Sequence, residues 1–306
     1  MLKIKLSQLE MLVAVVDCGG FSAAAAELDC TQSRISHAIS ELETSLGTRL
    51  LHRSRVGCTL TEAGYQVVAK ARQMLHIGQS MVESVRHARS LAGKVRIACF
   101  RSAGTYLIPP ALEALSREYP QIHVEVDDGF PDYQEIVSHV KQGLADIGVI
   151  RMTADNGLIS LPFVHDDYVL VLPSSMKIAH PLDWNQLAPL PFIQLSAQGM
   201  QWVVDQCRAN GFTHVPVRKQ ANESGIVGLV AEGLGFSILP RLSIFPEPPE
   251  VKVCSLPMVC QRNLTFILSA DGSRDETIKT VLRFIRDKQL LRKTRPFKAG
   301  VIAFDY

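Results

Sequence analysis

The stretch TQSRISHAISELE, residues 31–43, carries the pattern of a helix with an unusual outer face. Ile35, Ile39, Leu42 and, beyond the quoted stretch, Leu46 repeat at the spacing that lines one side of a helix. The opposite side collects short polar side chains, namely Ser33, Ser36, His37 and Ser40. Because a helix that only faces water usually carries Glu and Lys there, this face predicts contact with another molecule.

The residues before this helix predict a shorter helix packed closely against it. Ser22 is the expected N-cap, and residues 23–28 form an alanine-rich helix with almost no side-chain bulk. Asp29 and Cys30 form a tight connection, and Thr31 caps the next helix. A helix, a short turn and a second helix form the motif whose second helix lies in the major groove of DNA.

The residues after the helix predict a hairpin wing. Gly47 ends the helix, and two short strand-like runs follow around residues 53–55 and Gly57. Arg53 and Arg55 would then reach the DNA backbone or a narrow minor groove. An ordinary exposed helix remains the alternative for residues 31–43 alone, but residues 32–61 hold four arginines against two acids, which favours DNA.

Residues 4–64 resemble the winged helix-turn-helix of LysR-type transcriptional regulators. The motifs that carry the resemblance are Leu9, GGFSAAAAEL (19–28), TQSRISHAISELETSLGTRLLHR (31–53) and LTEAG (60–64), and a weaker match covers nearly the whole chain. The family usually has Pro where Ser33 stands and often Arg where His37 stands. Both positions face the groove, so the resemblance implies the fold of the motif but no particular base preference.

The polar types on this face suit DNA contact in different ways. Gln32 can bind adenine through two hydrogen bonds, and Arg34 suits a phosphate or guanine. Hydroxyls reach either bases or phosphates, and their short side chains permit close approach. The predicted DNA-binding residues are Gln32, Ser33, Arg34, Ser36, His37, Ser40, Arg53 and Arg55.

The segment from Glu62 to Leu91 predicts a long helix that joins two compact parts. It contains no Pro, and apolar or small residues repeat at spacings of three and four at Val68, Ala71, Leu75, Gly78, Val82 and Val85. This seam predicts pairing with a second copy of the chain, and a helix packed on its own domain is the alternative. The resemblance implies that this helix forms the dimer and that two dimers form a tetramer.

The rest of the chain alternates strands and helices, which predicts an α/β fold with parallel sheets. The first lobe is expected to hold a strand at 95–100, a helix to 119, a strand at 123–126, a helix at 133–142 and a strand at 145–150. A second lobe starts near Tyr168, with helices at 201–210 and 224–232. Crossover segments near 161–168 and 262–269 join the lobes, which together resemble a periplasmic-binding-protein-like effector domain.

These patterns predict a winged helix-turn-helix at 1–61 and a linker helix at 62–91. Lobe 1 would comprise 92–163 with 269–306, and lobe 2 would comprise 164–268. In such sheets, ligands bind where strands end and helix N-termini present free N–H groups. This rule selects Arg101, Ser102, Ala103, Thr105, Phe130, Asp132, Ser196, Gln198, Met200, Trp202, Asn222 and Glu223. Each residue alone could be an ordinary cap or loop residue, so the prediction depends on their meeting in one cleft.

The expected effector is a small molecule, and an anionic metabolite is favoured. Helix N-termini and the hydroxyls of Ser102 and Ser196 favour negative charge, and Arg101 adds to this if it points inward. Glu223 favours an amine or hydroxyl instead.

Composition and cysteine usage are those of an ordinary globular protein. The chain has 306 residues, 47% of them hydrophobic, and its N-terminus lacks the features of a signal peptide, so we expect a cytoplasmic protein without a membrane segment. Its seven cysteines form no CxxC pair and lack zinc-ligand spacing, which predicts reduced, packed thiols and no metal. A redox pair of Cys254 with Cys260 is the alternative.

Charge and motifs limit the classes of function. The net charge is +2, and the basic residues from Lys279 to Lys298 fit the solvated face of a packed helix. No GxSxG, HExxH, P-loop or dinucleotide fingerprint occurs, so we expect neither an enzyme nor a bound cofactor. The expected partners are double-stranded promoter DNA and further copies of the chain, with RNA polymerase as a further candidate. A two-lobed solute-binding receptor is the alternative function, but it would need export and would not carry a helix-turn-helix.

Overall fold

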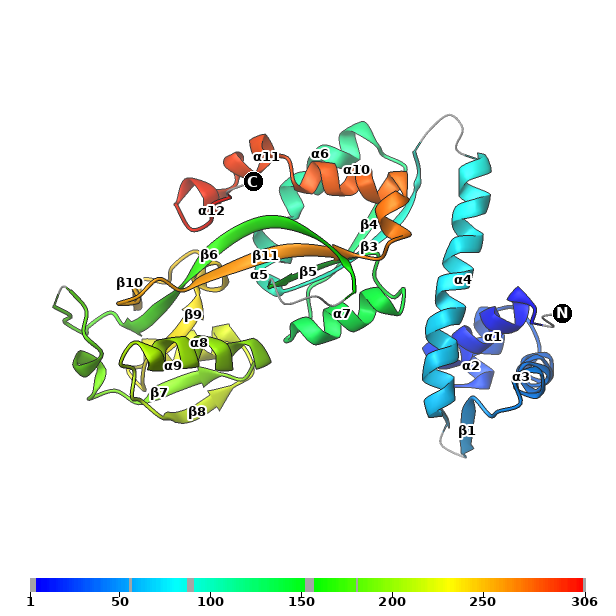
Figure 1. The fold of residues 1–306 in the computed structure, drawn as a ribbon, viewed down its shortest axis with the longest axis horizontal. Helices are drawn as coiled ribbons and strands as arrows, with labels where there is room; N and C mark the ends of the chain where they lie inside the picture. Colours follow the sequence, from blue (N-terminus) through cyan, green and yellow to red (C-terminus); the bar gives the residue numbers. More distant parts are fainter. Residues whose placement is uncertain (1–3, 55–56, 87–90, 152–156, 180, 305–306) are drawn as a thin grey trace. The chain divides into compact units, whose positions relative to one another are not determined.

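The computed structural model describes residues 4–54, 57–86, 91–151, 157–179 and 181–304. The chain divides into two compact units, residues 1–90 with 141–144 and residues 91–140 with 145–306. The elements of both units are labelled in Figure 1.

Three helices build the core of the N-terminal unit: α1 (Leu6–Asp17), α2 (Phe21–Glu27) and α3 (Gln32–Leu46). Ile35, Ile39 and Leu42 of α3 are fully buried with residues of α1, as their spacing predicts. Leu46 was expected on the same stripe, but it is exposed, since the buried stripe ends one turn earlier at Leu42.

Helix α2 packs against α1 and α3 with little side-chain bulk. Ala24 and Ala25 are buried in the shared core, so the alanine-rich segment packs as predicted. The helix begins at Phe21 with Gly20 at its N-cap, so the expected cap at Ser22 is wrong and Ser22 lies inside the first turn. Asp29 follows in a left-handed conformation with φ of 46°, which Asp tolerates in tight turns.

Both ends of α3 are capped. The Thr31 hydroxyl accepts a hydrogen bond from the Arg34 N–H at 3.3 Å. Gly47 ends the helix in the left-handed region with φ of 70°, and the next N–H, of Thr48, bonds back to the Glu43 carbonyl at 3.2 Å. The Glu43 carboxylate also accepts from the Leu50 N–H at 2.8 Å, which fixes the start of the wing to the helix.

The wing is a two-stranded antiparallel hairpin. β1 (Leu51–Ser54) pairs with β2 (Gly57–Leu60), and Ser54 lies opposite Gly57. The predicted contact residue Arg55 lies outside the described residues, and so does the side chain of Arg53.

Helix α4 (Glu62–Arg86) starts from a tight junction with the wing. The Thr61 hydroxyl donates to the Arg49 carbonyl at 2.8 Å and accepts from the Gly64 N–H at 2.9 Å. A Cβ atom on Gly64 would lie 2.1 Å from the Leu50 carbonyl oxygen, so only glycine allows the helix to approach the strand this closely.

The seam predicted along α4 is only partly available to a second copy. Val68 and Ala71 are buried in the core of the N-terminal unit, and Leu75 packs against that core. The alternative interpretation, a helix packed on its own domain, is therefore correct for these three residues, because they cover the apolar side of α1. Met74 and Ile77 are the exposed large apolar residues of this stretch, at 42% and 45%. The side chains of Val82 and Val85 lie outside the description.

The second unit contains one large sheet whose strands run in both directions. Its order is β10-β6-β11-β5-β3-β4, and β9 also pairs with β6. The strands are β3 (Gly93–Cys99), β4 (Ile122–Asp127), β5 (Ile147–Arg151), β6 (Ile159–Pro173), β9 (Ser237–Pro240), β10 (Val251–Ser255) and β11 (Gln261–Leu268). β3 is parallel to β4 and β5, whereas β11 is antiparallel to β5 and β6. The expected parallel pairing is therefore found for β3 with β4 and β5, whereas the pairs that involve β6 and β11 are antiparallel.

Two long strands connect the lobes. β6 has 15 residues, and it pairs with β11 in one lobe and with β9 and β10 in the other. Figure 1 shows β6 in green beside β11 in orange along this path. Tyr168 lies within β6, so the second lobe does not start a new strand there as predicted.

Separate hydrophobic cores define the lobes. Lobe 1 packs around residues such as Ile97, Leu107, Phe266 and Val281, and lobe 2 around residues such as Leu170, Ile193, Val203 and Phe236. The lobe 1 helices are α5 (Arg101–Tyr106), α6 (Pro109–Glu118), α7 (Tyr133–Lys141), η3 (Gly272–Arg274), α10 (Glu276–Ile285), α11 (Lys288–Lys293) and α12 (Arg295–Lys298). Lobe 2 contains η1 (Trp184–Leu187), β7 (Phe192–Leu195), α8 (Gln198–Ala209), β8 (Pro216–Gln220) and α9 (Glu223–Ala231), and η2 (Arg241–Ile244) follows β9.

The single helix expected up to Tyr119 is two helices. α5 ends at Tyr106 and α6 starts at Pro109. Proline has no N–H to continue a helix but fits its first turn, so Pro109 and Pro110 begin a new helix.

Among the described residues no single helix is long and apolar enough to cross a bilayer. Only the bent pair of α1 and α2, taken together, meets that test.

Candidate functional site

Helix α3 presents a polar outer face. Gln32, Ser33, Arg34, His37 and Ser40 are exposed, and Ser36 is half-buried at the edge of the face. The Ser40 hydroxyl donates to the Ser36 carbonyl at 2.8 Å. These six predicted residues therefore share the solvent side of one helix, opposite Ile35 and Ile39.

His37 is held through Glu41. Its Nδ1 lies 3.6 Å from Glu41 Oε1, and Glu41 Oε2 accepts a hydrogen bond of 3.0 Å from the Gln8 side chain of α1. The imidazole is 76% exposed. It is thus oriented by two helices while its outer edge faces solvent.

A cavity of about 110 Å³ lies between the two lobes of the second unit. Seven of the predicted effector residues line it: Arg101, Ser102, Phe130, Asp132, Met200, Asn222 and Glu223. Residues that the sequence did not single out complete the lining, including Phe100, Asp128, Tyr133, Arg151, Tyr168, Gly199 and Arg262.

Four of the other five predicted residues are not part of the cavity lining, and the fifth, Gln198, has an undescribed side chain. Ala103 is buried in the core of lobe 1, and Thr105 and Ser196 are exposed elsewhere. Gln198 starts α8, but its side chain lies outside the described set. Trp202 lies behind the lining, where its ring contacts Arg151.

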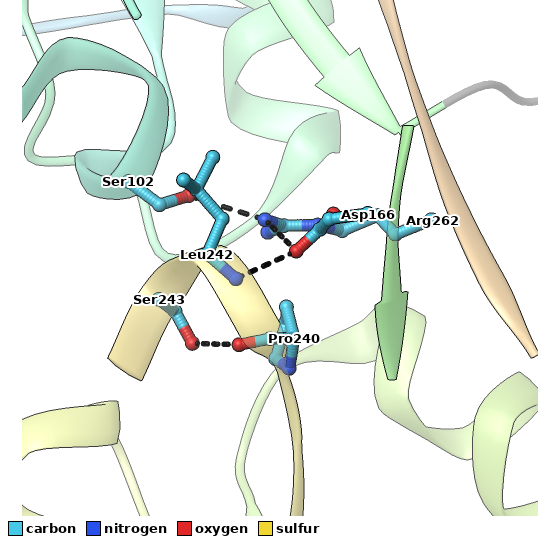
Figure 2. A network of polar contacts seen from close by, with 6 residues as sticks. All are labelled: Ser102, Asp166, Pro240, Leu242, Ser243 and Arg262. Atoms are coloured by element: carbon cyan, nitrogen blue, oxygen red, sulfur yellow. Dashed lines mark hydrogen bonds and ion pairs between the residues drawn. The ribbon is translucent and has the colours of Figure 1, made fainter. Parts of the chain in front are cut away.

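A buried ion pair forms the floor of the cavity (Figure 2). Arg262 of β11 donates to Asp166 of β6 from Nε at 2.7 Å and from Nη2 at 3.0 Å, and both side chains are almost fully buried. Nη2 also donates to the Ser102 hydroxyl at 3.3 Å, and Asp166 accepts from the Leu242 N–H at 2.9 Å. The network therefore connects α5, both long strands and η2.

The positive charge of Arg262 is strongly stabilised. Burial alone would lower the pKa of Arg262, but the adjacent Asp166 carboxylate outweighs this effect and raises that pKa above its usual value. Arg262 thus stays charged and already has a partner. Ser102 accepts a hydrogen bond from Arg262, so it orients this side chain as well as lining the cavity.

Arg151 is a second cation in the wall, and it forms no ion pair with the residues that the structure describes. It ends β5, and its guanidinium lies 5.1 Å from the centroid of the Trp202 ring. A Cβ on Gly199 would lie 3.4 Å from Arg151 Nε, so the guanidinium rests on the first turn of α8. Within the described part of the chain, Arg151 has no carboxylate partner.

Three carboxylates line the same cavity. Asp128 packs against Gly104 of α5, where a Cβ would approach Asp128 Cβ to 2.7 Å. Asp132 accepts from the Gln134 N–H at 3.1 Å, and Glu223 lies in the first turn of α9. Burial raises the pKa of the neighbouring Tyr168 to about 12, so its hydroxyl is neutral at physiological pH.

Comparison with known proteins assigns both parts of the chain. Residues 6–65 match the family model "Bacterial regulatory helix-turn-helix protein, lysR family", and residues 88–290 match "LysR substrate binding domain". The chain belongs to the LysR family. It is a DNA-binding transcriptional regulator with an effector-binding domain.

Relatives of this LysR-family chain extend over most of its length. A probable HTH-type transcriptional regulator LrrA of Synechococcus elongatus is 36% identical over 296 residues, which cover 96% of this chain and 98% of that protein. The regulator CysL of Bacillus subtilis is 29% identical, and the match covers 76% of this chain and 79% of that protein.

Solved structures share the fold of this LysR-family chain. A full-length OxyR variant from Pseudomonas aeruginosa has a TM-score of 0.72 at 22% identity, and the match covers 93% of this chain and 98% of that chain. Full-length CbnR in complex with its target DNA has a TM-score of 0.53 at 22% identity and covers 92% and 99% of the two chains.

Proposed function

We propose that α3 of this regulator reads promoter DNA with Gln32, Ser33, Arg34, Ser36, His37 and Ser40, and that Arg53 and Arg55 of the wing hold the backbone. The single observation that supports this most is the exposed polar face of α3, where short side chains allow the helix to approach base edges. His37 takes a fixed orientation from Glu41, which suits a base contact more than a mobile surface histidine would.

A small-molecule effector would bind in the cavity between the lobes and alter promoter binding. Its lining comes from both lobes, so a bound ligand would favour one lobe arrangement over another. A coupling of about 1–3 kcal/mol is enough to change promoter occupancy. Ser102, Arg262 and Asp166 would form the rigid floor of this site, and Arg101, Arg151 and Glu223 would offer charge to the ligand.

Dimerisation through α4 would use exposed apolar residues rather than Val68 and Ala71, the seam residues that the chain's own core buries. Met74 and Ile77 are exposed, and Leu6 of α1 is 52% exposed with its Cδ1 4.0 Å from the position of a Cβ on Gly78. These exposed apolar residues belong to the same unit, and a second copy would bury them. A tetramer of two dimers, and a contact with RNA polymerase, stay predictions from the family resemblance.

Mapping the DNA fragments that the purified chain binds would test this proposal. Genomic fragments retained by the full-length chain at moderate salt define the operator, and a fluorescently labelled fragment then gives the affinity. Ser36→Ala and His37→Ala should lose preference for the operator over unrelated DNA. If both variants keep the full preference while folded, the assignment of α3 to the groove is wrong.

A further inference from the structure

The cavity between the lobes is lined by charges of both signs. Apart from the Arg262–Asp166 pair, its lining carries Arg101 and Arg151 together with Asp128, Asp132 and Glu223. Over the residues that the structure describes, none of these five side chains forms an ion pair. Charged groups that have lost part of their water without gaining a partner are costly, so this arrangement indicates a ligand that supplies the missing charges.

One end of the cavity suits a carboxylate. The Arg151 guanidinium rests on Gly199 in the first turn of α8, a helix of 12 residues whose N-cap Ala197 has no side-chain acceptor. A cation and the positive end of a helix dipole therefore lie against each other. An anion placed there would contact both, and it would relieve their mutual repulsion.

Another part of the lining suits a cation. α9 differs from α8, because Asn222 caps it through a 2.7 Å hydrogen bond from the Gly225 N–H and Glu223 occupies its first turn. The N-terminus of α9 is thus already satisfied, and the Glu223 carboxylate is available to the ligand. Asp128 and Asp132 add two carboxylates from lobe 1. Two arginines against three carboxylates leave a formal excess of one negative charge, which disfavours a ligand that is only an anion.

The size of the cavity limits the ligand further. An engineered cavity of about 150 Å³ accommodates benzene, so about 110 Å³ corresponds to on the order of six non-hydrogen atoms. Phe130 and Met200 give the walls apolar surface for a short carbon chain between the charged ends.

We infer that the effector is a small amino-acid-like zwitterion, whose carboxylate binds Arg151 and the N-terminus of α8 and whose ammonium binds Glu223 with Asp128 and Asp132. This inference rests on the proposed function, because it names the ligand class of that site. Arg151 comes from lobe 1 and Glu223 from lobe 2, so a zwitterion between them contacts both lobes with its two ends.

Trp202 offers a direct readout of the carboxylate end. The chain has two tryptophans. Trp184 is buried and donates to the Asn210 carbonyl at 2.8 Å, whereas Trp202 is half-exposed against Arg151. In a Trp184→Phe variant of the full chain, Trp202 is the only tryptophan, and a carboxylate that reaches Arg151 should change its emission. Calorimetric titration of the unaltered chain gives the affinities independently of that variant.

The probes are short zwitterions and their analogues with one charge. Glycine, L-alanine, β-alanine and 4-aminobutanoate carry both charges, propanoate and butanoate carry only the carboxylate, and propylamine carries only the ammonium. We expect at least one zwitterion to bind at least about tenfold more tightly than every analogue with one charge. The inference is overturned if a carboxylate alone or an amine alone binds as tightly as the best zwitterion, or if no probe binds.

Matched variants separate the two ends of the ligand. Arg151→Gln should reduce the affinity for the zwitterion to that for propylamine, and Glu223→Gln should reduce it to that for butanoate. Arg208→Gln on α8 and Glu232→Gln after α9 make the same chemical changes at exposed positions outside the lining, and they should leave binding unchanged. Equal losses in the matched and cavity variants would overturn the inference.

A parallel measurement keeps the ligand class distinct from the proposed function. Affinity of the full chain for its operator fragment is measured with and without the best zwitterion. If the zwitterion binds the cleft but leaves operator binding and bending unchanged, the ligand class stands and the regulatory role of the cleft fails. If butanoate alone changes operator binding, the regulatory role stands and the zwitterion class fails.

Discussion

Arg262 lies directly opposite Asp166 in the antiparallel register of β11 and β6, and its guanidinium binds that carboxylate through two hydrogen bonds. The two residues are 96 positions apart in the chain. Their pair lies where both long strands pass from one lobe to the other, so it fixes the strands to each other under the cavity.

Removing one member of this pair should destabilise the effector-binding unit. Arg262→Met leaves the Asp166 carboxylate buried without its cation, which typically costs about 3–5 kcal/mol. Arg208→Met breaks an exposed pair with Asp205 and should cost less than about 1 kcal/mol. Urea unfolding of both variants measures the difference. Equal free energies of unfolding would show that the buried pair has no special structural role.

The face of α3 should carry sequence preference, and the wing should not. Ser36→Ala or His37→Ala should weaken operator binding by about 1–3 kcal/mol per lost base contact, with little effect on unrelated DNA. Arg53→Ala should weaken binding to all sequences alike and reduce the salt dependence. Ser45→Ala changes an exposed serine near the end of the same helix and serves as the control. Fluorescence anisotropy with both DNAs distinguishes these patterns.

Two glycines of α4 should respond oppositely to alanine. Gly64→Ala places a Cβ 2.1 Å from the Leu50 carbonyl oxygen, so the junction between wing and helix must shift and the N-terminal unit should lose stability. At Gly78 the nearest atom is Leu6 Cδ1 at 4.0 Å, so Gly78→Ala should be tolerated and gain up to about 1 kcal/mol of helix propensity. In thermal unfolding, Gly64→Ala should therefore melt at a lower temperature than the unaltered chain, and Gly78→Ala at an equal or higher one. A harmless Gly64→Ala would contradict the close approach.

Charge on the exposed side of α4 should dissociate the oligomer without unfolding the unit. Ile77→Glu places a carboxylate on the proposed dimer surface, whereas Val68→Glu places it in the hydrophobic core of the chain's own unit. We expect Ile77→Glu to lower the oligomer mass at unchanged stability, and Val68→Glu to unfold the unit. Gln66→Glu adds the same charge at an exposed polar site as a control. Ultracentrifugation showing an unchanged mass for Ile77→Glu would remove this face as the interface.

The buried cysteines should remain thiols and resist mild oxidation. Burial raises the pKa of Cys99 and Cys207 to about 12 and that of Cys260 to about 11. Since the thiolate is the reactive form, mild peroxide should leave operator binding unchanged. A reversible change in the footprint that is lost in Cys254→Ser would contradict this expectation.

The same shifts predict how stability depends on alkaline pH. The ordinary pKa of a cysteine thiol is 9.0, so above that pH the unfolded chain releases protons that the folded chain retains. The free energy of unfolding should thus be unaffected by these groups below pH 9 and fall as the pH rises through the folded values. Urea unfolding at pH 8 and at pH 10.5 checks the sign. In the Cys260→Ala variant, the free energy of unfolding should fall less steeply with rising pH.

Local patterns predicted the N-terminal unit well because its contacts are close in sequence. The stripe of Ile35, Ile39 and Leu42, the cap at Thr31 and the end at Gly47 each depend on neighbours within one or two turns. The burial of Val68 and Ala71 could not be predicted in the same way. Their spacing fits either a partner helix or α1, and only the tertiary packing distinguishes the two.

Seven residues of the cavity lining were predicted from the sequence, and the larger part was not. Strand ends and helix starts identified Ser102, Phe130 and Glu223, because these positions follow from the order of the elements. Arg262 lies within a strand, and its contact with Ser102 joins residues 160 positions apart. Arg151 ends its strand as the rule requires. The two residues that its guanidinium contacts, Trp202 and Gly199, belong to the other lobe. No local sequence pattern reveals contacts of this kind.

β6 pairs with strands of both lobes and with β11 across their boundary, and this limits how the protein could be recombined. A lobe cannot be exchanged with that of a relative at a loop, because every boundary between the lobes cuts two paired strands and the Arg262–Asp166 pair between them. The elements from α1 to α4, in contrast, are continuous in sequence from Leu6 to Arg86 and could be transplanted as one segment. Chimeric sensors built from this chain should therefore keep the two lobes together and exchange only the part that reads DNA.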